Sequence, residues 1–143
     1  MMYSVNQVAI FAPMLVVVAL TFVAFIRMAA ARGAVAKTMD MNFYRAHQGG
    51  QEPEAAVVAV RHYGNLLELP TLFYAGCLTA FVLPAVSMWT LAFAWGFAAA
   101  RVAQSAVHLT YNNPAHRGLA FVLGVVFVLA LWVNVALSIF ARL

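Results

Sequence analysis

Four long apolar stretches constrain this chain more than any other feature of its sequence. They cover about residues 5–27, 55–85, 88–111 and 117–141, and each is long enough to cross a hydrocarbon core, which takes about 20 helical residues. Only 8% of the 143 residues are charged, against roughly 25% in soluble domains. We therefore predict an all-α integral membrane protein, a single domain over residues 1–143 that folds as a four-helix transmembrane bundle.

The first apolar stretch shares one feature with a secretory signal, because the small residues Ala29–Ala31 follow it. However, no positive charge precedes the stretch, and Arg27 and Arg32 follow it, which reverses the order of charges in a signal peptide. We expect a retained helix. The single cysteine, Cys77, lies within the second stretch and excludes a disulfide within the chain.

Basic residues gather in two of the connections between the apolar stretches. The first and third connections, with the residues beside them, hold Arg27, Arg32, Lys37, Arg45 and Arg117, whereas the opposite side holds Arg142. By the positive-inside rule, both of these connections are expected in the cytoplasm and both termini on the other side. The net charge of +4 is not arranged as a basic patch with interleaved aromatic residues, so we expect no nucleic-acid partner.

Polar side chains recur at helical spacing within the two middle stretches. The second stretch carries Arg61, Asn65 and Glu68, and their spacing of four and three places them on one face of a helix. The third stretch carries a similar polar stripe, made of Arg101, Gln104, His108 and Tyr111. Because a charged side chain within a membrane costs at least about 2.5 kcal/mol on insertion scales, such stripes indicate a definite role.

The two stripes match each other in depth. In antiparallel helices, residues at equal depth have numbers with a constant sum, and three pairs here each add to 169: Glu68 with Arg101, Asn65 with Gln104, and Arg61 with His108. We expect these pairs to face each other, the first as a buried ion pair. Arg61, which then has no carboxylate partner, is expected to bind an anion together with Arg117. The alternative is that both arginines extend to lipid phosphates.

At these residues the sequence resembles the MAPEG family, the membrane-associated proteins in eicosanoid and glutathione metabolism. The family pattern of Arg, three residues, Asn, two residues and Glu, followed by a proline and an aromatic-rich run, is matched by residues 61–73. The resemblance continues through Arg101, Gln104 and His108 and reaches Arg117 at the start of the fourth helix. It covers nearly the whole chain.

The resemblance implies a homotrimer that binds glutathione between subunits and acts as a transferase or peroxidase on lipophilic electrophiles. Arg117 would stabilise the thiolate. The expected glutathione contacts are Arg61, Asn65, Glu68, Arg101, Gln104, His108, Tyr111 and Arg27. The short chain is expected to be a bacterial member of the inner membrane. One departure is that eukaryotic synthases carry His or Tyr where this chain has Gln104 and His108, so either Tyr111 substitutes or the ligand differs.

The sequence is also compatible with other functions. The departures favour a noncatalytic scaffold or accessory subunit that holds a lipid or another anion in the same pocket. A transporter is disfavoured because the charges lie in one half of the membrane, and the fourth helix carries only Asn134 and Ser138, expected as hydrogen-bonding residues between helices. No metal site is expected, because the histidines lack the spacing of zinc ligands.

Overall fold

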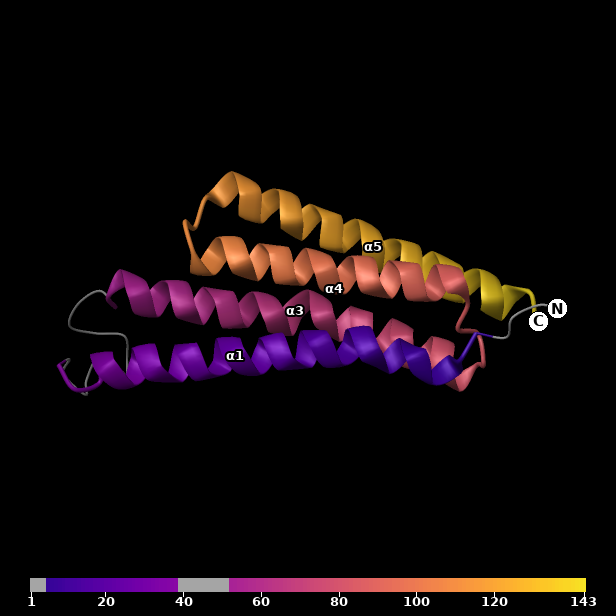
Figure 1. The fold of residues 1–143 in the computed structure, drawn as a ribbon, viewed down its shortest axis with the longest axis horizontal. Coiled ribbons are helices and arrows are strands. Elements are labelled where there is room, and N and C mark those ends of the chain that lie inside the picture. The colour runs from indigo at the N-terminus through magenta and orange to yellow at the C-terminus, as the bar shows by residue number, and fades with distance from the viewer. Residues whose placement is uncertain (1–4, 39–51) are drawn as a thin grey trace.

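The computed structural model describes residues 5–38 and 52–143. Within them, a short 3-10 helix η1 (Gln7–Ile10) precedes four α-helices: α1 (Phe11–Val35), α3 (Glu54–Val82), α4 (Met88–Leu109) and α5 (Pro114–Phe140). The helices lie lengthwise beside one another (Figure 1), and α1 begins at the same end of the bundle at which α5 ends. The opposite end, where α3 and α5 begin, is the pocket end. Arg45 and its neighbours lie outside the described residues.

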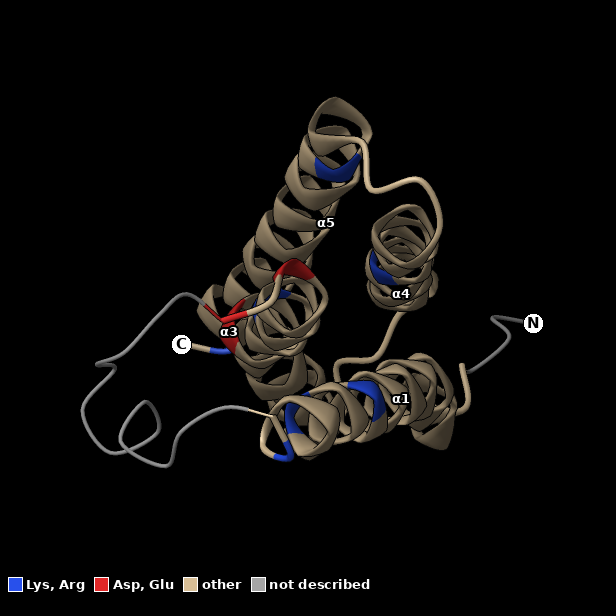
Figure 2. Ribbon diagram, turned by 90° about the vertical axis from the view of Figure 1, so that its left-hand side faces the viewer, with Lys and Arg blue, Asp and Glu red and all other residues tan. Residues whose placement is uncertain are grey.

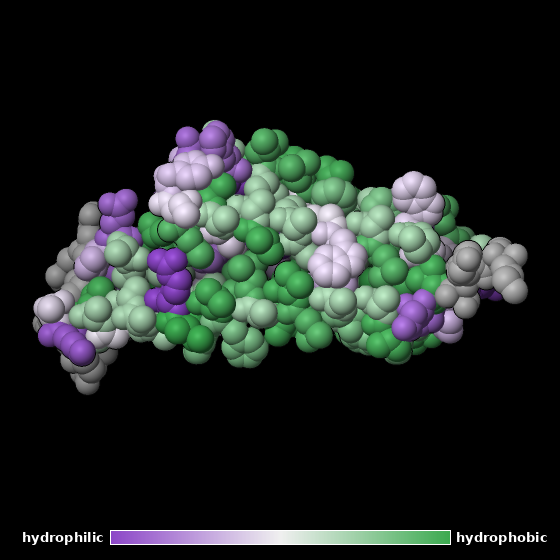
Figure 3. Space-filling view, viewed as in Figure 1, coloured by the Kyte–Doolittle hydropathy of each residue, from purple (hydrophilic) through white to green (hydrophobic). Residues whose placement is uncertain are grey.

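Three of the described helical segments are long and apolar enough to cross a membrane: Gln7–Val35, Glu54–Val82 and Pro114–Phe140. The helix α4 is not among these three, and its second half carries Arg101, Gln104 and His108, all buried inside the bundle. Many large apolar side chains are exposed instead. Figure 3 shows hydrophobic residues over the middle of one face, with hydrophilic residues mainly toward the ends. Such an outward apolar surface suits lipid rather than water.

The ends of α1 and α3 follow from local sequence. The helix α1 continues beyond the predicted end at residue 27 to Val35, because residues 29–36 are mostly alanine, the best helix former. The helix α3 starts at Glu54, directly after Pro53. An acidic side chain in the first turn complements the partial positive charge of the helix N-terminus.

Side-chain caps define the start of the other two helices. Ser87 and Thr90 form a reciprocal capping box at the start of α4. At α5, the Asn113 side chain accepts hydrogen bonds from the backbone N–H groups of Ala115 and His116, and Pro114 occupies the first helical position, which suits proline. This cap starts α5 three residues before the predicted residue 117.

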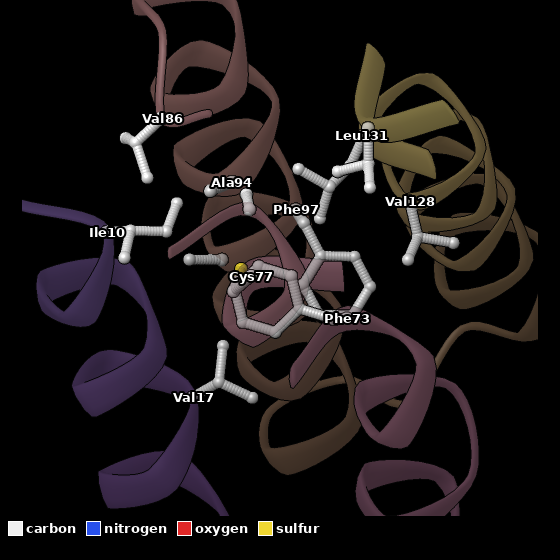
Figure 4. Close-up of a cluster of buried hydrophobic side chains, with 12 residues drawn as sticks. Ile10, Val17, Phe73, Cys77, Val86, Ala94, Phe97, Val128 and Leu131 are labelled. Carbon is white, nitrogen blue, oxygen red and sulfur yellow. The ribbon is translucent and has the colours of Figure 1, made fainter. Parts of the chain in front are cut away.

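The apolar core occupies the half of the bundle away from the pocket end. Figure 4 shows its side chains converging from α1, α3, α4 and α5. The rings of Phe73 and Phe97 stack at its centre with centroids 4.4 Å apart, and Cys77 is buried beside them. This arrangement leaves the polar side chains of α4 segregated in the other half.

Hydrogen bonds between elements reinforce the apolar half. The Gln7 side chain donates to the carbonyl of Val86 at 3.0 Å and accepts from its N–H at 2.9 Å. Thr90 Oγ1 donates to Asn134 Oδ1 at 2.9 Å, which confirms Asn134 as a hydrogen-bonding residue between helices. The same prediction for Ser138 is wrong, because its hydroxyl donates to the Asn134 carbonyl within α5.

Replacement of Asn134 by leucine should therefore destabilise the bundle more than Ser138→Ala does. Hydrogen bonds between membrane helices contribute about 0.6 to 1.7 kcal/mol, so Asn134→Leu is expected to lower the free energy of unfolding by about 1 kcal/mol. Reversible unfolding in mixed detergent micelles measures both variants. Equal effects of the two substitutions would contradict this assignment.

Candidate functional site

The inner face of α4 carries a row of buried polar side chains at the pocket end of the bundle. Arg101, Gln104, Ser105 and His108 are all at most 6% exposed, and their spacing of three, one and three keeps them on one side of the helix. Viewed along the bundle from this end, basic residues lie on α1, α4 and α5 (Figure 2). The site is built around this row.

Arg101 is completely buried between α4 and α5. Its Nη2 donates a hydrogen bond to the Phe121 carbonyl at 3.2 Å, and its guanidinium carbon lies 5.1 Å from the ring centroids of both Phe97 and Phe121. Its Nε and Nη1 have no hydrogen-bond partner within the described part of the chain. Aromatic faces and a carbonyl oxygen therefore provide the negative potential that a carboxylate would supply.

The predicted ion pair between Glu68 and Arg101 is wrong. Glu68 is exposed on the outside of α3, and the only ion pair within 4.0 Å among residues 5–38 and 52–143 joins Arg32 to Glu52, at 3.5 Å. The predicted facing of Arg61 and His108 is wrong for the same reason, since Arg61 is exposed. The charged members of the α3 stripe, Arg61 and Glu68, are exposed instead of packing on α4, because another face of α3 packs against it.

The face of α3 that packs against α4 carries His62. This residue was not among the predicted site residues. Its Nε2 is hydrogen-bonded to Ser105 Oγ at 2.9 Å, and its ring stacks on His108 with centroids 4.8 Å apart. His108 Nε2 donates to the Val58 carbonyl at 3.2 Å, whereas His108 Nδ1 has no partner among the residues described.

The predicted depth register between the two helices is confirmed by these contacts. His62 meets Ser105, and deeper in the bundle Phe73 meets Phe97, so facing residues lie within about two positions of the predicted sum. The error concerned rotation of α3 about its axis. The sequence does contain a signal for the missed contact. Ser105 lies between Gln104 and His108, which makes the polar face of α4 wider than the stripe of Arg101, Gln104 and His108 alone.

A polar cleft opens at the pocket end between α3, α4 and the start of α5. Its volume is about 210 Å³, and it is lined by Asn65, Gln104, Pro114, Arg117, Gly118 and Phe121. Three of the predicted site residues thus meet in one cavity, including the pair Asn65 and Gln104. Arg117 is half-buried there, and its Nη1 donates to Asn112 Oδ1 at 2.6 Å. The cleft offers two amides and a guanidinium to a bound molecule.

The other predicted site residues do not line this cleft. Arg101 and His108 are buried on the same face of α4 as Gln104. Tyr111 is 60% exposed, and its hydroxyl is hydrogen-bonded to His116 Nδ1 at 2.8 Å. The exposed members of the predicted set are Arg27 on α1 and Arg61 and Glu68 on α3.

The MAPEG family model matches residues 10–137 of the chain. The chain belongs to the MAPEG family. Comparisons with curated proteins and with solved structures give no match. Membership agrees with the predicted membrane bundle of helices, and it supports, in general terms, a glutathione-related function of the transferase or peroxidase type.

The hydrogen bond between His62 and Ser105 should contribute measurably to the stability of the bundle. Because a buried hydrogen bond contributes about 1 kcal/mol, a double-mutant cycle with His62→Phe and Ser105→Ala should give a coupling energy of about that size. The matched control is the exposed hydrogen bond between Tyr111 and His116, tested with Tyr111→Phe and His116→Ala, for which we expect coupling near zero. Comparable coupling in both cycles would contradict the assignment.

Proposed function

We propose that this chain is a membrane-bound transferase or peroxidase that uses glutathione against lipophilic electrophiles. The observation that carries the proposal is the polar cleft, which brings the Arg117 guanidinium together with the amides of Asn65 and Gln104 inside a bundle of the MAPEG family. Amide side chains both donate and accept, and they match the peptide groups of glutathione.

Arg117 has the principal chemical role in this proposal. The reactive form of glutathione is the thiolate, and a guanidinium beside the sulfur favours the thiolate over the thiol. The bond from Arg117 Nη1 to Asn112 Oδ1 occupies one of the five guanidinium N–H groups. The others remain available for a ligand, and the bond itself holds the side chain at the mouth of the cleft.

In this proposal the exposed residues Arg27, Arg61 and Glu68 bind the charged ends of the peptide. Phe25 of α1 packs on Tyr63 of α3 with ring centroids 5.7 Å apart, so Arg27 lies near the level of Arg61 in these antiparallel helices. Two guanidinium groups at one level can each bind a carboxylate. We assign Glu68 to the glutathione amino group, and Tyr111, with the buried Arg101 and His108, to the surrounding shell.

A second cavity suits the lipophilic partner. This lateral groove lies between α1 and α3, has a volume of about 360 Å³, and is lined by Val18, Thr21, Phe22, Phe25, Tyr63, Leu66, Leu67, Pro70, Thr71 and Tyr74. Most of these side chains are apolar, and Leu66 is next to Asn65 of the polar cleft in α3. An electrophile dissolved in the bilayer would reach this groove without crossing water.

The resemblance to the family implies a homotrimer, and the outward charges of α3 support the covering of this face by further copies. Arg61 and Glu68 are exposed in the single chain, and charged side chains that face acyl chains are costly. Further copies that cover this face would remove the charges from lipid and place them in sites between subunits. The arginines of the pocket end, including Arg27 and Arg117, favour the cytoplasmic side by the positive-inside rule, which in a bacterial inner membrane gives access to cellular glutathione.

Equilibrium binding of glutathione to the purified protein in detergent tests the proposal. A hydrogen bond to a charged group contributes about 1.5 to 3 kcal/mol, so Arg117→Ala should weaken binding at least about tenfold. It should also abolish the ultraviolet absorbance of the bound thiolate. The matched control is Arg142→Ala, which removes an exposed arginine at the other end of the bundle.

The alternative outcomes separate the possible functions. If the wild-type protein binds no glutathione at millimolar concentration, the transferase proposal fails and the noncatalytic scaffold is favoured. If glutathione binds but Arg117→Ala and Arg142→Ala behave alike, the cleft is not the binding site.

A further inference from the structure

Arg101 is the one charged side chain that is completely buried within the described residues, and it connects α4 to α5. It donates to the backbone carbonyl of Phe121 at 3.2 Å and lies 5.1 Å from the centroid of the Phe121 ring. A carbonyl oxygen has two lone pairs, so Phe121 can accept this bond in addition to its helical one. The guanidinium thus binds a specific point on α5.

Gly124 makes this contact possible. A Cβ atom at Gly124 would overlap Arg101 Nη2 and would lie 3.0 Å from both Cζ and Nε, so any other residue there would displace the guanidinium. Small residues at such points let membrane helices approach closely. Arg101 and Gly124 are therefore complementary parts of one contact.

The contact lies at the edge of the polar cleft, one turn along α5 from Arg117. Phe121 lines the cleft and follows Arg117 by four residues, which places the two on the same side of α5. A bond to the Phe121 carbonyl restrains the rotation and the sliding of α5 at this level. The position of Arg117 over the cleft depends on both.

We propose that Arg101, admitted by Gly124, is a positioning residue that holds the first two turns of α5 so that Arg117 faces the polar cleft. This inference rests on the proposed function, because that proposal assigns the stabilisation of the thiolate to Arg117. Arg101 itself does not line the cleft, so it acts on the thiolate through Arg117.

A second glycine in the same helix interface supplies a matched control. A Cβ atom at Gly96 of α4 would overlap the ring of Phe127 of α5. Gly96→Ala and Gly124→Ala therefore make the same chemical change in the same interface, and each forces a neighbouring side chain to move. Gly124→Ala displaces the Arg101 guanidinium, whereas Gly96→Ala displaces the Phe127 ring, which does not line the cleft.

Two readouts on the full-length protein test the inference. Hydrogen exchange should become at least about tenfold faster at the backbone amides of residues 117–121 in Gly124→Ala but not in Gly96→Ala. In the glutathione complex, the titration midpoint of the bound thiol should rise by about one pH unit in Gly124→Ala alone. At a pH below the midpoint, this rise means an about tenfold smaller fraction of thiolate. Both variants are expected to lose thermal stability to a similar extent.

The outcomes of these two measurements distinguish the positioning role of Arg101 from the proposed function. Equal changes in the two alanine variants, or no change in either, would overturn the positioning role and leave Arg101 as a packing residue. If the wild-type protein binds no glutathione, the proposed function fails, and the exchange measurement still decides the positioning role. If Gly124→Ala does not fold, Arg101→Lys replaces it, because lysine keeps the charge but loses the planar fork. The inference requires the same faster exchange in that variant.

Discussion

The burial of Arg101, which has no carboxylate partner among residues 5–38 and 52–143, is the constraint on which the rest of the structure depends. A charge within a membrane must be compensated, and here a carbonyl oxygen and two aromatic faces do this. The compensation requires α5 to approach α4 closely, and the absence of a side chain at Gly124 leaves room for the guanidinium. The contact restrains α5 against α4 next to the cleft, which is the basis of the positioning role that we propose for Arg101.

The bundle has an apolar half and a polar half. One half is closed by stacked rings and aliphatic side chains, and the other collects the polar residues of α4 around the cleft with Asn65 and Arg117. The lateral groove lies along the outside of α1 and α3 and includes Leu66, next to Asn65. An enzyme that joins a polar thiol to a lipophilic electrophile needs both environments, which is why this arrangement supports the proposed chemistry.

The sequence predicted the helices and their depth register because both follow from apolar length and from a constant sum of residue numbers. The sequence also predicted that Asn65, Gln104 and Arg117 lie at one end of the bundle, and the structure places them in one cleft. It failed on the pair Glu68 and Arg101, because periodicity shows which residues share a face of a helix but not where that face points. In α3, the face with His62 and Phe73 packs on α4, and the charged face points outward.

Tyr111 shows a different limit of spacing arguments. It continued the polar stripe by number, but α4 ends at Leu109, and the backbone then turns through Asn112, whose φ of 47° lies in the left-handed region. Asparagine adopts this conformation more readily than most residues. Helical spacing no longer applies beyond that point, so Tyr111 contacts His116 instead of the cleft.

A cryo-EM structure of the protein in a lipid nanodisc with glutathione would show whether the polar cleft holds the peptide. We expect density for glutathione in the cleft, with its sulfur beside the Arg117 guanidinium and polar contacts to Asn65 and Gln104. Density for glutathione elsewhere, or a lipid head group in the cleft while glutathione is present in excess, would contradict this expectation.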